Sequence, residues 1–244
     1  MGRRESSRRP FFVRARLLDR PRRDDGQWRM SAIDPTAPAW ASSALLTIDM
    51  QRDFGRPDGA AFIDGTDRVL PMVARLRGAF VAAGRPVFHA TRLYLADGTN
   101  AERSRQRMIA ASGPVVRPGH AGAALLPMGQ REAQPDAAVA LLAGEFLEVG
   151  LREWLFYKPR WSAFYGTRLA DRLSALGIDT VVIAGCNFPN CPSATLFDAT
   201  ERDFRVVLAA DAVSRFSDDG RQWCTGIGVV ALDVETIADA LSSH

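Results

Sequence analysis

Three polar residues in this sequence combine into one kind of chemistry. They are an acid, Asp49 in "LLTIDMQRDF", an amine, Lys158 in "LFYKPRW", and a thiol, Cys191 in "IAGCNFPNC". A thiol can attack a carbonyl carbon, and a carboxylate can take the thiol proton and return it to a leaving amine. Lys158 is the only lysine among 31 lysine and arginine residues, and a compact ammonium suits a crowded contact better than a planar guanidinium. Together the three types predict nucleophilic hydrolysis.

Each of the three residues also has a non-catalytic interpretation. An aspartate after a strand often caps a turn, a single lysine is usually solvated, and a single cysteine is often a small buried hydrophobic residue. The joint pattern favours chemistry, because Asp49 and Lys158 end predicted strands and Cys191 follows one. In open parallel sheets, ligands bind beyond the carboxyl ends of the strands.

The elements that must position these residues alternate between strand and helix patterns. This alternation predicts an α/β fold of three layers, in which a six-stranded parallel sheet is covered by helices on both faces. The region Leu95–Gly150 is irregular, and we expect it to form loops, one or two helices and a wall of the site. Strand patterns occupy residues 44–49, 86–90, 153–158, 180–185, 204–211 and 234–237, and helix patterns occupy 66–84, 167–177, 191–203 and 218–232.

Composition and charge divide the chain into two parts. Residues 1–40 contain 10 arginines and 5 acidic residues, whereas the rest of the 244-residue chain is slightly acidic. We therefore expect a basic, disordered N-terminal extension over residues 1–40 and one folded domain over residues 41–244. The alternative is that the basic arm contacts nucleic acid.

The remaining bulk features indicate a soluble cytoplasmic protein. No apolar run is long enough to cross a bilayer, and no secretory signal is recognised. Three cysteines, an odd number, argue against a disulfide framework. Cys186 and Cys224 are expected to be buried and inert, and His89 to belong to the core. The three histidines are far apart in the sequence, so we predict no metal and no other cofactor.

The blocks around the three polar residues resemble the isochorismatase-like cysteine hydrolase superfamily, which includes nicotinamidases, N-carbamoylsarcosine amidases and ureidoacrylate amidohydrolases. The resemblance extends from about Ala44 to Ala240 and rests on "LLTIDMQRDF", "YKPRWSAFYGTRL" and "VVIAGCNFPNCPSATLFDATERDFRVVLAADA". It implies a six-stranded sheet in the order 3-2-1-4-5-6. It also implies a small-molecule substrate and a homodimer or homotetramer. Neither a membrane nor a nucleic acid is expected as a partner.

The resemblance also implies roles for particular residues. Asp49 would be the general base, Lys158 its partner and Cys191 the nucleophile. A non-proline cis peptide would join Cys186 to Asn187, and the backbone N–H groups of Asn187 and Cys191 would form an oxyanion hole. The substrate pocket is expected to contain side chains that follow the second strand, follow Lys158 or lie in the oxyanion turn, namely Arg92, Tyr94, Trp161, Phe164, Tyr165 and Phe188.

Departures from the family pattern narrow the expected activity. The segment "FHATRLYLADGTN" lacks the histidines of a nicotinamidase metal cluster, and "NFPNCP" resembles the streptothricin-hydrolase type. Members that hydrolyse a vinyl ether lack the nucleophilic cysteine, so Cys191 favours cleavage of a C–N bond in an amide, lactam or ureido compound through a thioester. Two alternatives stay open. One is a vinyl-ether hydrolase that uses Asp49 without covalent catalysis, and the other is a non-catalytic binding protein whose basic arm contacts nucleic acid.

Overall fold

The protein is described by a computed structural model over residues 34–111, 113–133 and 137–243. The predicted N-terminal extension lies outside the described residues except for residues 34–40. From Pro35 onward the chain forms one compact unit. Within the described residues, no helix is both long enough and apolar enough to cross a membrane.

The elements follow one another along the chain as the alternating pattern predicts. The strands are β1 (Ser43–Ile48), β2 (Val87–Thr91), β3 (Phe146–Gly150), β4 (Glu153–Tyr157), β5 (Thr180–Gly185), β6 (Arg205–Val213) and β7 (Val230–Leu232). The α-helices are α1 (Arg52–Gly55), α2 (Thr66–Ala82), α3 (Arg103–Ala111), α4 (Ala137–Leu142), α5 (Leu169–Ala175), α6 (Cys191–Thr200), α7 (Asp218–Gly226) and α8 (Val234–Ser242). Short 3-10 turns cover Trp40–Ser42 and Ala121–Ala123.

The strands form one sheet in the order β3-β4-β2-β1-β5-β6-β7. Six of them, from β4 to β7 in this order, pair in parallel with the predicted topology 3-2-1-4-5-6. The seventh, β3, was not predicted and pairs antiparallel with β4. It lies within the region expected to be irregular, and only Leu151 and Arg152 separate it from β4, with Arg152 at φ 55°.

The last elements differ from the prediction of a helix over residues 218–232 followed by a strand over residues 234–237. The helix α7 ends at Gly226, β7 is the final strand, and residues 234–237 begin α8. Asp233 caps this helix by accepting a hydrogen bond from the Thr236 N–H at 2.7 Å. Val234, Ile237 and Leu241 are all buried, and their spacing of three and four residues is that of one helix face. The four residues 234–237 alone are too few to distinguish this spacing from a strand.

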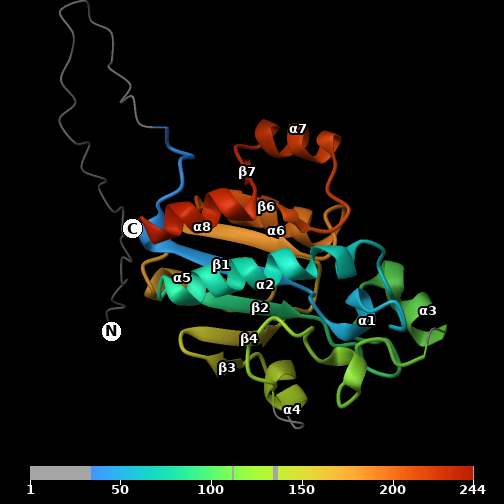
Figure 1. The fold of residues 1–244 in the computed structure, drawn as a ribbon. Coiled ribbons are helices and arrows are strands. Elements are labelled where there is room, and N and C mark those ends of the chain that lie inside the picture. Colours follow the sequence, from blue (N-terminus) through green and yellow to red (C-terminus); the bar gives the residue numbers. More distant parts are fainter. Residues whose placement is uncertain (1–33, 112, 134–136, 244) are drawn as a thin grey trace, which may run out of the picture. The chain divides into compact units, whose positions relative to one another are not determined.

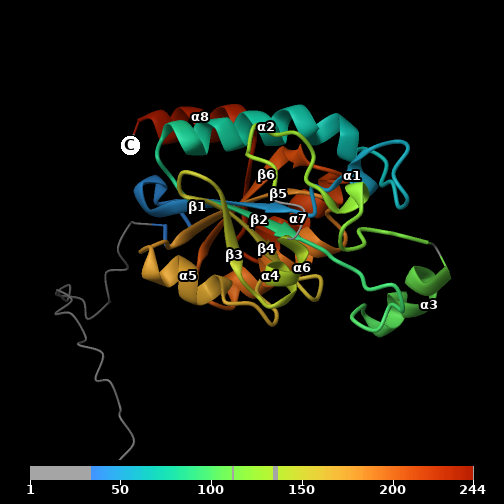
Figure 2. The same cartoon turned by 90° about the horizontal axis from the view of Figure 1, so that it is seen from below.

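Helices cover both faces of the sheet. Figures 1 and 2 show α2 and α8 side by side on one face, with α5 and α6 on the other. The strand β1 is buried at every position and contributes alternately to both cores: Leu45 packs with the α2 side, and Leu46 packs with the α5 and α6 side. The helices α1 and α3 lie beyond the carboxyl ends of the strands, where the sequence predicts the site (Figures 1 and 2).

A buried polar network ties two neighbouring strands to α2. Glu153 at the start of β4 receives two hydrogen bonds of 2.7 Å from the Arg77 guanidinium, and its Oε1 lies 2.9 Å from His89 Nε2. The other ring nitrogen of His89 lies 2.7 Å from Thr47 Oγ1. The side chains of His89 and Glu153 are 0% and 1% exposed, so His89 belongs to the core as predicted.

Replacing Glu153 by glutamine should lower the free energy of unfolding by about 3 kcal/mol, because the charge of Arg77 would stay mostly buried without its partner. Urea unfolding followed by circular dichroism measures this change. The matched control is Glu148→Gln on the neighbouring strand β3, where the glutamate is exposed and the expected change is below about 0.5 kcal/mol. Equal effects of the two substitutions would contradict the importance of the network.

The same network should make stability depend on acid. Burial alone would raise the pKa of Glu153, but hydrogen bonds from Arg77 and His89 outweigh it and lower the pKa from 4.5 to about 2. A depressed folded-state pKa gives a stabilising contribution that is complete above the unfolded value and disappears as the pH falls through the folded value. The wild type should therefore lose more stability than Glu153→Gln between pH 4.5 and about 2, measured by unfolding at a series of pH values.

Candidate active site

A buried ion pair joins the carboxyl ends of two strands. Lys158 Nζ lies 2.9 Å from Asp49 Oδ2, and the lysine side chain is fully buried. Asp49 directly follows β1 and has a left-handed conformation with φ 51°, which aspartate tolerates better than most residues. Lys158 follows β4 and donates its backbone N–H to the Thr91 carbonyl at 2.9 Å. The ammonium also contacts the Arg160 carbonyl at 3.3 Å.

The thiol lies beside this pair. Cys191 is the first residue of α6, and Pro192 follows it in the first turn, where proline is tolerated. Asp49 and Cys191 line one small cavity of about 20 Å³, which is called the active-site cavity below. Its volume is enough for about one water molecule. The other lining residues are Phe54, Ile63, Arg92, Arg105, Cys186, Asn187 and Asn190.

The surroundings of Cys191 keep its sulfur protonated. A helix N-terminus and a nearby ammonium would each favour a thiolate. Instead burial, and next the Asp49 carboxylate, raise the pKa of the Cys191 thiol to about 12, and Lys158 and Arg92 oppose this without cancelling it. The resting group is therefore a neutral thiol beside a carboxylate. Asp49 Oδ1 is buried, and no hydrogen bond to it is found among the described residues.

The turn before Cys191 has the geometry that the resemblance implied. The peptide bond from Cys186 to Asn187 is cis. Among the described residues, no hydrogen bond is found for the backbone N–H of Asn187 or of Cys191. Both groups therefore remain available as donors to a developing oxyanion. Gly185 before this turn has φ 119°, and a Cβ there would lie 2.3 Å from the Ile48 carbonyl oxygen.

Arg92 lines the cavity, but its charge is already engaged. Its guanidinium is buried and lies 2.7 Å from Glu102 Oε2 and 2.9 Å from the Tyr94 hydroxyl. It also donates to the Lys158 carbonyl at 3.4 Å. Tyr94 is buried beneath this ion pair and is not among the lining residues of the cavity.

The four other predicted pocket residues do not line the active-site cavity. Phe164 lies in the core, with its ring 5.8 Å from that of Phe204, and Phe188 packs on Phe216 and Trp223. Tyr165 is 60% exposed. Trp161 is partly exposed and lies under the guanidinium of Arg105, 5.6 Å from it.

Sequence reasoning missed six side chains of the cavity, one of which is Cys186, expected only to be buried and inert. Arg105 lies in the irregular region, where no periodic pattern marks the inward face of α3. Asn187 was predicted only for its backbone, and Asn190 only as part of the turn. Phe54 and Ile63 had no role assigned, although Phe54 belongs to the first family block.

Two residues of that first block hold the irregular wall in place. Gln51 accepts a hydrogen bond from the Arg92 N–H at 2.8 Å and donates to the carbonyls of Arg92 and Ala123. Asp53 accepts from the N–H groups of Val116 at 2.6 Å and Ala60 at 3.3 Å. Their side chains therefore fix distant loops around the cavity.

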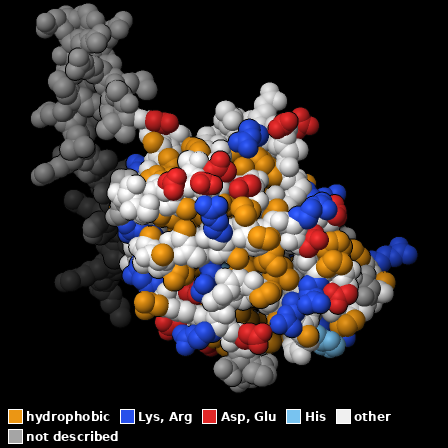
Figure 3. All heavy atoms as spheres, in the orientation of Figure 1, with side chains coloured by type: hydrophobic (Ala, Val, Ile, Leu, Met, Phe, Trp, Pro, Cys, Tyr) orange, Lys and Arg blue, Asp and Glu red, His pale blue; other side chains and the backbone are white. Residues whose placement is uncertain are grey.

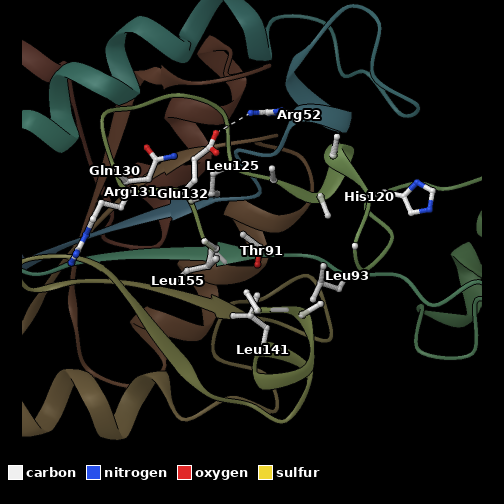
Figure 4. Close-up of a pocket in the computed structure, with 17 residues that line it drawn as sticks. Arg52, Thr91, Leu93, His120, Leu125, Gln130, Arg131, Glu132, Leu141 and Leu155 are labelled. Carbon is white, nitrogen blue, oxygen red and sulfur yellow. Dashed lines mark hydrogen bonds and ion pairs between the residues drawn. The ribbon is translucent and has the colours of Figure 1, made fainter. Parts of the chain in front are cut away.

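A larger cavity of about 370 Å³ lies elsewhere and contains none of the three predicted catalytic residues. Figure 4 shows it between the side chains of Leu93, Leu125, Leu141 and Leu155, with the Arg52–Glu132 ion pair beside it. It is lined largely by aliphatic carbon. No group of three or more potential metal ligands occurs in the part of the chain that the structure describes, and the expected absence of a metal stays a prediction.

Comparison with known proteins agrees with this geometry. The Isochorismatase domain family matches residues 43–227. The chain is 31% identical over 194 residues to the ureidoacrylate amidohydrolase RutB of Methylobacterium radiotolerans, which covers 74% of this chain and 68% of that protein. It is 29% identical over 181 residues to a probable inactive nicotinamidase of Arabidopsis thaliana, covering 73% of this chain and 83% of the relative.

A solved structure shows the same architecture. An isochorismatase family protein from Desulfovibrio vulgaris superimposes with a TM-score of 0.69 at 29% sequence identity, covering 82% of this chain and 98% of that one. The family match alone spans most of the described domain. From its sequence and its fold, this protein belongs to the isochorismatase family.

Proposed function

We propose that this protein is a cysteine-dependent amidohydrolase that cleaves a C–N bond of a small amide, lactam or ureido compound through a thioester. The observation that carries the proposal is the position of Asp49, which pairs with the buried Lys158 and lines the same cavity as the Cys191 thiol. The similarity to a ureidoacrylate amidohydrolase supports C–N bond cleavage. The similarity to a probable inactive nicotinamidase makes a direct assay important.

The first half of the reaction forms the thioester. Cys191 Sγ bonds to the carbonyl carbon while its proton passes to Asp49, because a thiol with a pKa of about 12 attacks only as it is deprotonated. The backbone N–H groups of Asn187 and Cys191 would stabilise the oxyanion. As the C–N bond breaks, the leaving nitrogen takes the proton from Asp49 and departs as an amine or ammonia.

The second half releases the acid. Asp49 removes a proton from a water molecule, whose oxygen attacks the thioester carbon. The carbon–sulfur bond then breaks, and Asp49 returns the proton to the sulfur. Lys158 keeps the carboxylate oriented in both halves and offsets the negative charge that passes between oxygen and sulfur. The expectations of a homodimer or homotetramer and of a cytoplasmic location belong to this proposal.

Within the part of the chain that the structure describes, no observation favours the alternative of nucleic-acid binding. On the face seen in Figure 3, basic and acidic side chains are interspersed and do not form one basic area. The basic residues 1–33 lie outside the described part of the chain. The small cavity with a buried acid and thiol instead favours a small-molecule substrate.

The nucleophile is tested by replacing Cys191 with alanine. Ammonia or amine release from a panel of amides, lactams and ureides should fall at least about 10⁴-fold, because no sulfur remains to form the thioester. Cys224→Ala is the control, since Cys224 is also a buried cysteine but lies in α7 outside the cavity, and it should keep turnover. Undiminished amide hydrolysis by Cys191→Ala would refute the proposal. Thiol-independent cleavage of a vinyl ether would support the alternative.

The need for an amine beside Asp49 is tested by Lys158→Arg. The guanidinium keeps the charge but is wider and planar, so it should move the carboxylate, because the lysine side chain that it replaces is fully buried. We expect kcat/KM to fall by about 100-fold or more while the far-UV circular dichroism spectrum is unchanged. Arg160→Lys, a cation exchange next to the same segment, should have little effect. Near-normal turnover of Lys158→Arg would show that any cation serves.

A further inference from the structure

The larger cavity has the size and the lining of a site for an apolar molecule. Figure 4 shows the side chains of Leu93, Leu125, Leu141 and Leu155 around it, and alanines form much of the rest of the lining. Its volume is about 370 Å³, whereas an apolar space of about 150 Å³ already holds benzene. Water gains few hydrogen bonds among leucine and alanine side chains, so burial of an apolar guest is favoured there.

The polar side chains on the cavity side of this lining are already paired. Thr91 donates its hydroxyl to a backbone carbonyl of β4 at 3.1 Å. Both ends of the Gln130 amide are hydrogen-bonded to backbone groups. Arg52 pairs with Glu132 at 3.2 Å, and this pair lies toward solvent, because the glutamate side chain is 84% exposed.

Two other titratable side chains border the cavity without facing into it. His120 and Arg131 are both exposed, and in Figure 4 their side chains point away from the four leucines. Among the described lining residues, none therefore offers a charge to a guest buried between the leucines. A buried charge without a partner is costly, so the cavity should prefer a neutral molecule to an ion of the same size.

A single stretch of chain separates the larger cavity from the active-site cavity. Thr91 and Leu93 line the larger cavity, and Arg92 between them lines the active-site cavity. Alternate side chains thus face opposite sides, as they do in a strand. The two cavities share no lining residue, so residues 91–93 form a wall between them.

We propose that the larger cavity is an accessory ligand site for a neutral, mainly aliphatic small molecule. The carbon chain of this ligand lies among the four leucines, and a polar end such as a hydroxyl lies toward Arg52 and Glu132. Because the wall separates the two cavities, the ligand binds without displacing a molecule from Cys191. The site goes beyond amide hydrolysis and does not depend on it.

Photolabelling of the wild-type protein tests the site directly. The probe is a neutral aliphatic alcohol that carries a diazirine. On irradiation the diazirine loses N₂, and the resulting carbene inserts into a neighbouring C–H bond, which peptide mass spectrometry locates. Labelling should saturate, and it should fall on the leucines of the larger cavity, namely Leu93, Leu125, Leu141 and Leu155.

Competition defines the chemistry of the ligand. An excess of 1-hexanol should suppress the labelling. Hexanoate has the same chain length and is ionised at neutral pH, so it should compete about tenfold less well or worse, because its carboxylate finds no unpaired cation between the leucines.

The position of the ligand is tested by two neighbouring substitutions in α4. Ala138 lines the cavity, whereas Val139 is 76% exposed and is not among the lining residues. Ala138→Phe should fill the space and lower labelling by about tenfold, and Val139→Phe should leave it near the wild-type level. Far-UV circular dichroism checks that both variants fold. Cys191→Ala should label like the wild type, because Cys191 lies in the other cavity.

Three results would overturn the inference. They are labelling that does not saturate, competition by hexanoate as strong as that by 1-hexanol, and labels on Phe54 or Ile63 of the active-site cavity. All three are read in the wild type, so they decide the question even if Ala138→Phe fails to fold. Saturable labelling of the leucines in a protein without amide hydrolysis would leave the accessory site standing and refute only the proposed function.

Discussion

The structure depends on the contact between Lys158 and Asp49. Removing two opposite charges from water costs several kcal/mol per ion, and the attraction repays this only when the geometry is close. The geometry comes from the sheet: β1 and β4 are separated by β2, and their ends place the two side chains 2.9 Å apart. The thiol joins them because Gly185 lets β5 approach Ile48 closely before the chain turns into α6.

The ion pair between Asp49 and Lys158 leaves one carboxylate oxygen free to take part in the reaction. Lys158 satisfies one carboxylate oxygen of Asp49, and the other has no hydrogen bond among the described groups. A fully saturated carboxylate would be a poor acceptor for another proton. Asp49 therefore remains able to take the proton of Cys191, whose pKa of about 12 keeps it protonated until attack. Burial keeps the ion pair out of water and also raises the pKa of the Cys191 thiol, so the thiol needs Asp49 to take its proton.

The sequence predicted the parts of this molecule that repeat a simple rule. Alternating strands and helices predicted the parallel sheet, the family resemblance implied the order of its strands, and the ends of those strands pointed to Asp49, Lys158 and Cys191. The strand β3 could not be predicted, because "FLEVG" has no flanking pattern of its own and forms through its pairing with β4. The side chains around the cavity could not be predicted either. Whether an arginine such as Arg92 faces a substrate depends on Glu102, whose distance in space the sequence does not reveal.

The first family block, "LLTIDMQRDF", shows that a polar residue beside a catalytic acid can have a purely structural role. Gln51 and Asp53 are polar residues next to a catalytic acid, and either could have been assigned to the chemistry. Their hydrogen bonds instead go to backbone groups of loops far along the chain, including Arg92, Ala123 and Val116. The Gln51 and Asp53 side chains thus form hydrogen bonds with backbone groups of the loops, as neighbouring backbone groups would in a helix or a sheet.

The solitary lysine has a further consequence for the surface of the protein. Every other basic side chain that carries a permanent charge is an arginine, and the one side-chain amine is fully buried against Asp49. The folded domain therefore offers solvent no lysine for acylation, for ubiquitin attachment or for an amine-directed cross-linker. A reagent that modifies Lys158 would report that the interior has opened, so this side chain is a natural marker of unfolding at the site itself.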